Sequence, residues 1–319
     1  MRGSEESARI AGSEWIALVA AVLGGAMIGV QGRINGELAG RTHSAVEAAA
    51  ASFIVGLGML ALAVPFRRDG LARLRGAVAR GQVSWWWWFS GFGGAFLVAT
   101  SAHAVPKIGV ALVSVCLVAG TTTGALLTDQ FGVGPSGHHP PSFWRIAGVV
   151  TVIAAVVISS IGAEHGALRP ALVIVLFAAG ASTAFQQAAN GRLREAADDV
   201  VVASFVSFLG GSTILVLVLL LAEGHDLHAP PSAPWLYLGG PLGLVYILIG
   251  ASMVKVLGVL RFVLGVVAGQ LLAAVVMDLA WPEPGTSLRA ATVVGAFVTV
   301  AGVWLSGLGD TEGRVVADE

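Results

Sequence analysis

The sequence consists largely of long apolar runs, each close to the length of a membrane span. A helix needs about 20 mostly apolar residues to cross the hydrocarbon core of a bilayer. The runs are continuous, whereas the strands of a membrane barrel alternate over about 10 residues. We therefore expect an all-α, polytopic membrane protein with about ten transmembrane helices. The predicted spans lie at 15–38, 44–65, 86–104, 108–128, 143–162, 170–190, 200–222, 235–253, 256–278 and 289–308.

Charged side chains are too scarce to cover a water-facing surface. They make up 12% of the 319 residues, whereas hydrophobic residues make up 56% and the mean hydropathy is +0.83. A soluble globular domain carries about 25% charged residues. The formal net charge of -1 lacks the basic excess that is typical of nucleic-acid binding. These values exclude soluble enzymes and DNA-binding proteins. We therefore expect the lipid bilayer as a partner, and no nucleic acid.

The few basic residues indicate which ends of the spans face the cytoplasm. Thirteen of the 18 Lys and Arg residues fall on the side that holds the N-terminus, and five of these lie in the stretch 66–84. Because cytoplasmic loops carry an excess of Lys and Arg, we expect a multi-pass protein with both termini in the cytoplasm. Tryptophans 85–88 follow this stretch and are expected at the membrane interface. The other side has Arg33, Arg41, Lys107, Arg169 and Arg289.

The two halves of the chain repeat one another. Gln31 and Asn35 recur 155 residues later as Gln186 and Asn190. Repetition over several helices indicates a duplicated unit rather than chance agreement. The same offset relates Ser52, Phe53 and Gly56 to Ser207, Phe208 and Gly211, and a further block pairs 118–120 with 267–269.

The repeated unit has an odd number of spans, so the second copy must be inverted in the membrane. The loop charges agree, because the stretch 66–84 carries five arginines and its counterpart at 223–234 carries none. Inverted repeats are typical of secondary transporters. The expected organisation is a cytoplasmic head at 1–14, a first five-helix repeat at 15–162, a second, inverted repeat at 163–309 and a cytoplasmic tail at 310–319.

The repeated segments resemble a known family. Residues 29–38 are GVQGRINGEL and residues 51–56 are ASFIVG, and both segments recur in the second half. They are similar to the YdcZ-like branch of the drug/metabolite transporter superfamily, over nearly the whole chain. The resemblance implies the fused ten-helix form, located in the bacterial inner membrane and labelled an exporter. Small multidrug transporters of this superfamily use a glutamate inside the first helix, whereas Glu14 lies at its cytoplasmic mouth, so no proton-binding role is carried over.

The first and sixth spans place paired amides inside the membrane. Apolar sequence in the first span covers only 16–30, about 22 Å of helix, so Gln31 and Asn35 must enter the hydrocarbon region. They are four residues apart and share one face of the helix. Gln186 and Asn190 repeat this arrangement in the sixth span. The pairs either line a substrate pathway or hold helices together through interhelical hydrogen bonds.

Further polar residues complete the expected pathway. Gln270 lies midway along the ninth span, at the depth where the first half has Thr121. Glu47, early in the second span, is a candidate for proton coupling, because a carboxyl that is poorly hydrated in the membrane can exchange protons during transport. Alternatively, Glu47 is hydrated or pairs with Arg33 or Arg41. The predicted substrate pathway comprises Gln31, Asn35, Gln186, Asn190, Gln270, Thr121, Ser52 and Ser207.

These features define an expected function. The sequence has no P-loop, so an ion or proton gradient, or the gradient of the solute, would drive concentrative transport. We expect a secondary transporter, of exporter type, that moves a small organic solute or drug across the inner membrane by alternating access. The alternatives are a membrane-embedded enzyme acting on lipid and a non-transporting receptor or scaffold. No catalytic residue, cofactor or metal site is predicted, and Asp129 and Asp278, at the ends of equivalent spans, are assigned structural or interfacial roles.

Overall fold

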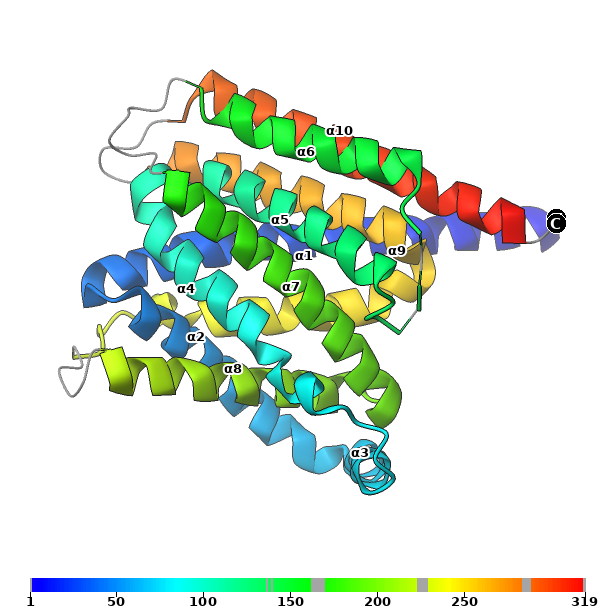
Figure 1. Cartoon of the computed structure of the whole chain (residues 1–319), viewed down its shortest axis with the longest axis horizontal. Helices are drawn as coiled ribbons and strands as arrows, with labels where there is room; N and C mark the ends of the chain where they lie inside the picture. Colours follow the sequence, from blue (N-terminus) through cyan, green and yellow to red (C-terminus); the bar gives the residue numbers. More distant parts are fainter. Residues whose placement is uncertain are drawn as a thin grey trace.

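The structure is a computed structural model. It describes residues 2–135, 137–138, 140–161, 170–222, 229–282 and 288–317, without the side chains at 2–14, 222, 250–252, 254–261, 307 and 309–317. These residues form helices and no strand, which confirms the all-α prediction, and six helices are long and apolar enough to cross a membrane. The elements (Figure 1) are α1 (Arg2–Thr42), α2 (Ala45–Ala63), the 3₁₀ helix η1 (Val64–Phe66), α3 (Arg68–Ala79), the 3₁₀ helix η2 (Trp85–Phe89), α4 (Gly91–Ile108), α5 (Val110–Gln130), α6 (Phe143–Ser159), α7 (Pro170–Ala197), α8 (Val200–Ala222), the 3₁₀ helix η3 (Pro234–Tyr237), α9 (Gly239–Ala280) and α10 (Ala290–Ala317).

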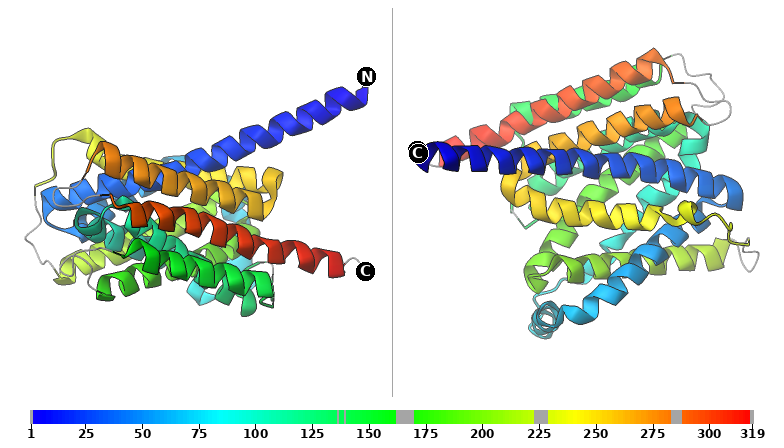
Figure 2. Two further views of the ribbon diagram at one scale, coloured as in Figure 1. Left: turned by 90° about the horizontal axis from the view of Figure 1, so that it is seen from above. Right: turned by 180° about the vertical axis from the view of Figure 1, so that it is seen from behind.

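The helices form one bundle with distinguishable ends. α1 begins and α10 ends at the same end, which we call the terminal end, and α3 also lies there (Figure 1, Figure 2). The other end is called the far end. α6 and α10 lie side by side as an outer layer, and Gly148 of α6 packs directly against Gly302 of α10. α5 lies in the core, where each residue from 110 to 120 is buried.

The helix α9 consists of two arms. Its 42 residues would extend about 63 Å if straight, twice the thickness of the hydrocarbon core. Instead it folds back on itself, so that the arms 239–249 and 262–280 run in opposite directions (Figure 2). Along the first arm, Gly24 lies against Ile249 and Gln31 lies against Gly243, so this arm is antiparallel to α1. Along the second arm, Ala21 lies against Gly265 and Gly29 lies against Ala273, so this arm is parallel to α1. The spans predicted at 235–253 and 256–278 therefore correspond to the two arms, joined by helical backbone.

The Arg-rich stretch 66–84 differs most from expectation. It was expected to be a loop, but it contains α3, whose buried residues Gly70, Leu74 and Ala77 lie on one side of the helix. The span expected to begin at residue 86 begins at Gly91, because the tryptophans form the separate 3₁₀ helix η2. Local hydropathy does not detect α3, since its stability comes from packing against other helices.

Corresponding helices of the two halves run in opposite directions, as α1 and α7 do in Figure 1. The turn between the first two helices is also repeated. His43 and Asp198, 155 positions apart, both adopt left-handed backbone conformations, with φ of 53° and 49°. The residues that follow them, Ser44 and Asp199, both cap the next helix by accepting backbone N–H groups. The predicted boundary at 162/163 between the halves lies outside the described residues.

The two halves meet at a pair of aromatic rings. Phe53 of α2 and Phe208 of α8 pack with ring centroids 5.1 Å apart. Each ring lies against a glycine of the opposite helix, since Gly56 contacts Phe208 and Gly211 contacts Phe53. All four residues belong to the repeated block. The contact is therefore related to itself by the exchange of the two halves, which places the pseudo-twofold axis between α2 and α8.

Candidate functional site

The first-half amide pair contacts two other helices. Ser52 Oγ donates a hydrogen bond to Asn35 Oδ1 at 2.6 Å, and both residues are buried. Gly239, the first residue of α9, lies so close that a Cβ at this position would overlap both side chains. Gln31, one turn earlier on α1, faces Gly243 of the same arm. The first-half site therefore joins α1, α2 and the first arm of α9.

The second-half pair makes the equivalent contact with the other amide. Gln186 Nε2 donates a hydrogen bond to Ser207 Oγ at 3.2 Å. The Gln186 side chain lies against Gly94 of α4, just as Gln31 lies against Gly243. Asn190 Oδ1 is buried and has no hydrogen-bond partner among the described residues. The two serines thus occupy equivalent positions but bond to different members of the repeated amide pair.

The position of these bonds is central. Ser52 and Ser207 directly precede the aromatic rings Phe53 and Phe208, so one amide–serine contact lies on each side of the axis between the halves. Each contact joins two consecutive helices, through residues that are 17 positions apart in the first half and 21 in the second. Hydrogen bonds of this kind between membrane helices contribute about 0.6 kcal/mol on average. Both interpretations of the amides therefore have a geometric basis.

Thr121 and Gln270 occupy equivalent positions beside the central contacts. Thr121 Oγ1 bonds to Gly180 O of α7 and to Thr183 Oγ1, both at 3.1 Å. Gln270 is buried, and its backbone lies against Gly29 of α1. In the described part of the chain, no hydrogen bond joins Thr121 to either amide–serine contact.

Glu47 lies in the first turn of α2. Its backbone N–H donates to Ser44 Oγ at 3.0 Å, and the spacing Ser44-x-x-Glu47 is that of a capping box. Of its two predicted partners, Arg41 pairs with Glu37 at 2.9 Å, and Arg33 also lies 3.5 Å from Glu37. The structure thus assigns Glu47 a position at a helix start and shows an acid, Glu37, that sequence analysis did not select.

The helix-end acids hold different partners. Asp278, at the end of α9, accepts the backbone N–H groups of Val110 and Ala111 at 2.8 Å each, and so caps α5 from a distant part of the chain. The cap is possible because Gly109, with φ of +80°, turns the chain sharply and leaves room for the carboxylate. Asp129, the equivalent acid, pairs with Arg145 of α6. Both side chains therefore hold helices together.

A cation–aromatic cluster at the far end was not predicted from the sequence. The buried Arg33 donates from Nε to Trp281 O at 3.1 Å, and its guanidinium lies 4.3 Å from the centroid of the Trp281 ring. Arg41 lies 5.3 Å from the Trp235 ring, and the two tryptophan rings are 5.2 Å apart. The cluster links α1 to residues that flank both ends of α9. The spacing of Arg33, Glu37 and Arg41 by four residues was the available signal.

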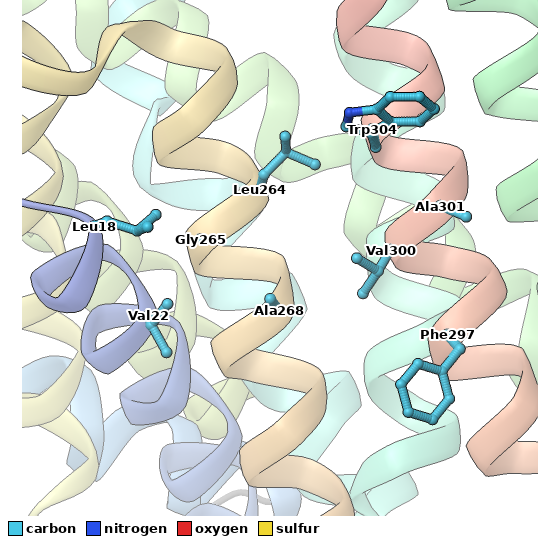
Figure 3. A pocket seen from close by; sticks show the side chains of 9 residues that line it. All are labelled: Leu18, Val22, Leu264, Gly265, Ala268, Phe297, Val300, Ala301 and Trp304. Carbon is cyan, nitrogen blue, oxygen red and sulfur yellow. The ribbon is translucent and has the colours of Figure 1, made fainter. Parts of the chain in front are cut away.

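An apolar groove of about 550 Å³ lies between α1, the second arm of α9 and α10 (Figure 3). It contains none of the predicted pathway residues. Its residues are apolar and come from the three helices, so the groove suits hydrocarbon rather than a polar solute. Its lining consists of Leu18, Val22, Leu264, Gly265, Ala268, Phe297, Val300, Ala301 and Trp304.

Oppositely directed halves that meet through equivalent contacts are typical of membrane transporters. The chain belongs to the family described as "Putative inner membrane exporter, YdcZ", whose model matches residues 16–158 and 171–305. The resemblance stated from the repeated segments is thereby confirmed. Comparison with curated proteins found no match. A solved structure, titled only as the crystal structure of a protein, matches with 20% sequence identity and a TM-score of 0.56. The match covers 93% of this chain and 98% of the chain in that structure. This likeness concerns the fold.

Proposed function

We propose that the protein exports a small organic solute by alternating access, using an ion gradient or the gradient of the solute. Its place in an inner membrane exporter family supports transport rather than catalysis. The observation that carries the proposal is the pair of equivalent amide–serine contacts in different arrangements, Asn35 with Ser52 and Gln186 with Ser207. Two inverted halves that differ in this way are what a transporter open toward one side requires, because exchanging the two arrangements reverses the opening.

In this proposal the amides form the central part of the pathway. The buried carbonyl oxygen of Asn190 supports such a role, because a buried acceptor without a hydrogen bond costs about 1–3 kcal/mol. A solute donor, or Ser207 in the other conformation, would satisfy it. Gln31, Thr121 and Gln270 are included as polar groups that lie at the helix contacts beside this centre. The alternative is that the amides only hold the helices together.

The experiment separates transport from packing. Purified protein is first screened by thermal shift with metabolites and cationic drugs, and any stabilising solute is then tested for flux in proteoliposomes. We expect Asn190→Leu to insert and fold normally but to lower flux at least tenfold. A role in packing alone would lower thermal stability and leave flux per folded molecule unchanged. Thr213→Val is the matched control, because among the described residues this exposed hydroxyl bonds only to Leu209 O of its own helix.

The arginines of α3 also support one orientation of the protein in the membrane. We propose that the terminal end faces the cytoplasm, because it carries the arginines of α3 as well as the start of α1 and the end of α10. A reporter that is active only in the periplasm, fused after residue 319, should then be inactive, whereas a cytoplasmic fluorescent reporter at the same position should be active. The opposite result would reverse the assignment of the two ends.

A further inference from the structure

The helix α3 lies across the bundle rather than along it. Figure 1 shows α3 nearly along its own axis, whereas α1, α9 and α10 extend across the picture. It contains the 12 residues Arg68–Ala79 and lies at the terminal end, where the spanning helices leave the membrane. We expect a helix in this position to lie in the plane of the membrane interface. Its two sides therefore meet different surroundings, the protein on one side and lipid headgroups on the other.

The inner side of α3 is fixed to the second half of the protein. Leu74 packs in one cluster with Leu193 of α7 and Val202 of α8. Gly70 allows close approach, because a Cβ there would lie 2.7 Å from the Cβ of Asp199. Arg73 pairs with Asp198 at 2.7 Å. These contacts fix the rotation of α3 about its own axis and so determine which residues face outward.

The outer side of α3 carries two arginines that have no protein partner in the part of the chain that the structure describes. Arg68 and Arg75 are seven residues apart, two turns on one face, and both are exposed. Neither makes a hydrogen bond or ion pair within the described residues, whereas Arg80 bonds to Gln82 at 3.1 Å. Between and beyond the two arginines the same face has only Ala72 and Ala79. The single acid of α3 is Asp69, in its first turn.

Exposed aromatic residues flank this basic face. Phe66, just before α3, is 85% exposed, and Trp85, at the start of η2, is 75% exposed. Aromatic residues are enriched at the headgroup level of membranes, where a basic amphipathic helix also lies. The guanidinium group suits a phosphate oxygen pair because it donates two parallel hydrogen bonds. The expected position of α3, its two outer arginines and the flanking aromatic residues are thus all consistent with a surface that contacts lipid headgroups.

We propose that Arg68 and Arg75 form a docking surface for the phosphate headgroups of anionic phospholipids. The surface is separate from the amide–serine contacts, and the proposal is independent of which solute is transported. Because α3 is fixed to the turn between α7 and α8, lipid bound at Arg68 and Arg75 stabilises the terminal end of the second half. A zwitterionic headgroup is a weaker ligand, since its ammonium group opposes the two guanidinium charges.

The test measures lipid binding to the purified full-length protein. Native mass spectrometry in detergent compares phosphatidylglycerol with phosphatidylcholine. We expect the wild type to retain phosphatidylglycerol preferentially and R68Q/R75Q to bind it about tenfold more weakly. The matched control R73Q/R80Q removes the same charge from α3 and the residue that follows it, but at arginines that already have protein partners, and is expected to keep the preference.

Several outcomes would overturn the proposal. Equal retention of the two lipids by the wild type, or unchanged phosphatidylglycerol binding by R68Q/R75Q, would show that this face is not a lipid site. An equal loss in R73Q/R80Q would show that total charge, rather than this face, attracts the lipid. Should R68Q/R75Q fail to fold, R68K/R75K is tested instead, because it keeps both charges but loses the paired donors. This variant should bind phosphatidylglycerol more weakly than the wild type does, but more strongly than the wild type binds phosphatidylcholine.

Discussion

Phe53 and Phe208 pack ring against ring at the axis between the two halves, with centroids 5.1 Å apart. Each ring also fills the space beside a glycine of the opposite helix. The contact is therefore possible only because Gly56 and Gly211 have no side chain. Small residues at a membrane helix interface allow this close approach, and dispersion between the packed surfaces stabilises it. The interface that relates the halves is therefore sensitive to single methyl groups.

Gly56→Ala is expected to destabilise the protein by about 1–3 kcal/mol, because the added methyl would overlap the Phe208 ring in a packed interface. Thermal unfolding of the purified protein in detergent measures the effect. Gly58→Ala is the control on the same helix, since nothing lies within 4 Å of a Cβ there. It should leave stability unchanged or raise it by up to about 1 kcal/mol through helix propensity. Equal effects of the two substitutions would contradict the interface.

Ser52→Ala is expected to cost more stability than Ser207→Ala. The bond from Ser52 to Asn35 is shorter, 2.6 Å against 3.2 Å for the bond between Gln186 and Ser207, and leaves a buried acceptor when it is lost. A double-mutant cycle of Ser52→Ala with Asn35→Leu should give a coupling energy of about 0.6–1.7 kcal/mol. Additive effects within error would mean that the hydrogen bond contributes nothing to folding.

Asp278→Ala is expected to cost about 1–2 kcal/mol, because it removes the acceptor for two backbone N–H groups at the start of α5. Asp278→Asn should cost less, since one acceptor oxygen remains. Unfolding by a denaturing detergent, followed by far-UV circular dichroism, measures both. Asp69→Ala, on an exposed surface of α3, is the control and should change stability by less than about 0.5 kcal/mol. The cap would be excluded if Asp278→Ala matched this control.

Sequence periodicity and recurrence predict much of this architecture, for identifiable reasons. Hydropathy detects spans, and recurrence at a fixed offset marked Asn35 and Ser52 before any contact was known. It does not decide whether Asn35 or Gln31 bonds to Ser52, because the two amides share one helix face. The pairing of Arg33 with Trp281 joins residues 248 positions apart and has no local signal.

The helix α3 was missed for another reason. It has the low mean hydropathy of a loop, and its amphipathic face spans only Gly70, Leu74 and Ala77. The stability of such a short helix comes from tertiary packing, here against α7 and α8, rather than from its own sequence. The two arms of α9 likewise pack against α1 through contacts between residues that lie far apart in the sequence.

The proposed proton-coupling role of Glu47 is separable from its position at the start of α2. Glu47→Gln keeps the backbone N–H that bonds to Ser44 but removes the titratable carboxyl, so transport should lose its dependence on external pH. Ser44→Ala removes the cap and leaves the carboxyl, so transport should keep its pH dependence while stability falls by about 1 kcal/mol. A pH response retained in Glu47→Gln would remove Glu47 from the mechanism, and flux in proteoliposomes at several external pH values measures it.

Arg33→Lys tests whether the cation–aromatic cluster stabilises the far end. The guanidinium of Arg33 donates to Trp281 O and lies over the Trp281 ring at the same time, whereas a lysine ammonium is a compact point charge that does not reproduce this planar arrangement. We expect a loss of about 1–3 kcal/mol in thermal unfolding, because a cation–aromatic contact and a buried hydrogen bond are both weakened. Arg41→Lys is the comparison within the same cluster, since Arg41 is exposed and its contacts with Glu37 and the Trp235 ring should contribute about 1 kcal/mol or less. If the two lysine variants unfold at the same temperature, the contacts of Arg33 with Trp281 hold α1 against the end of α9 no more strongly than the exposed contacts of Arg41 do, which contradicts this prediction.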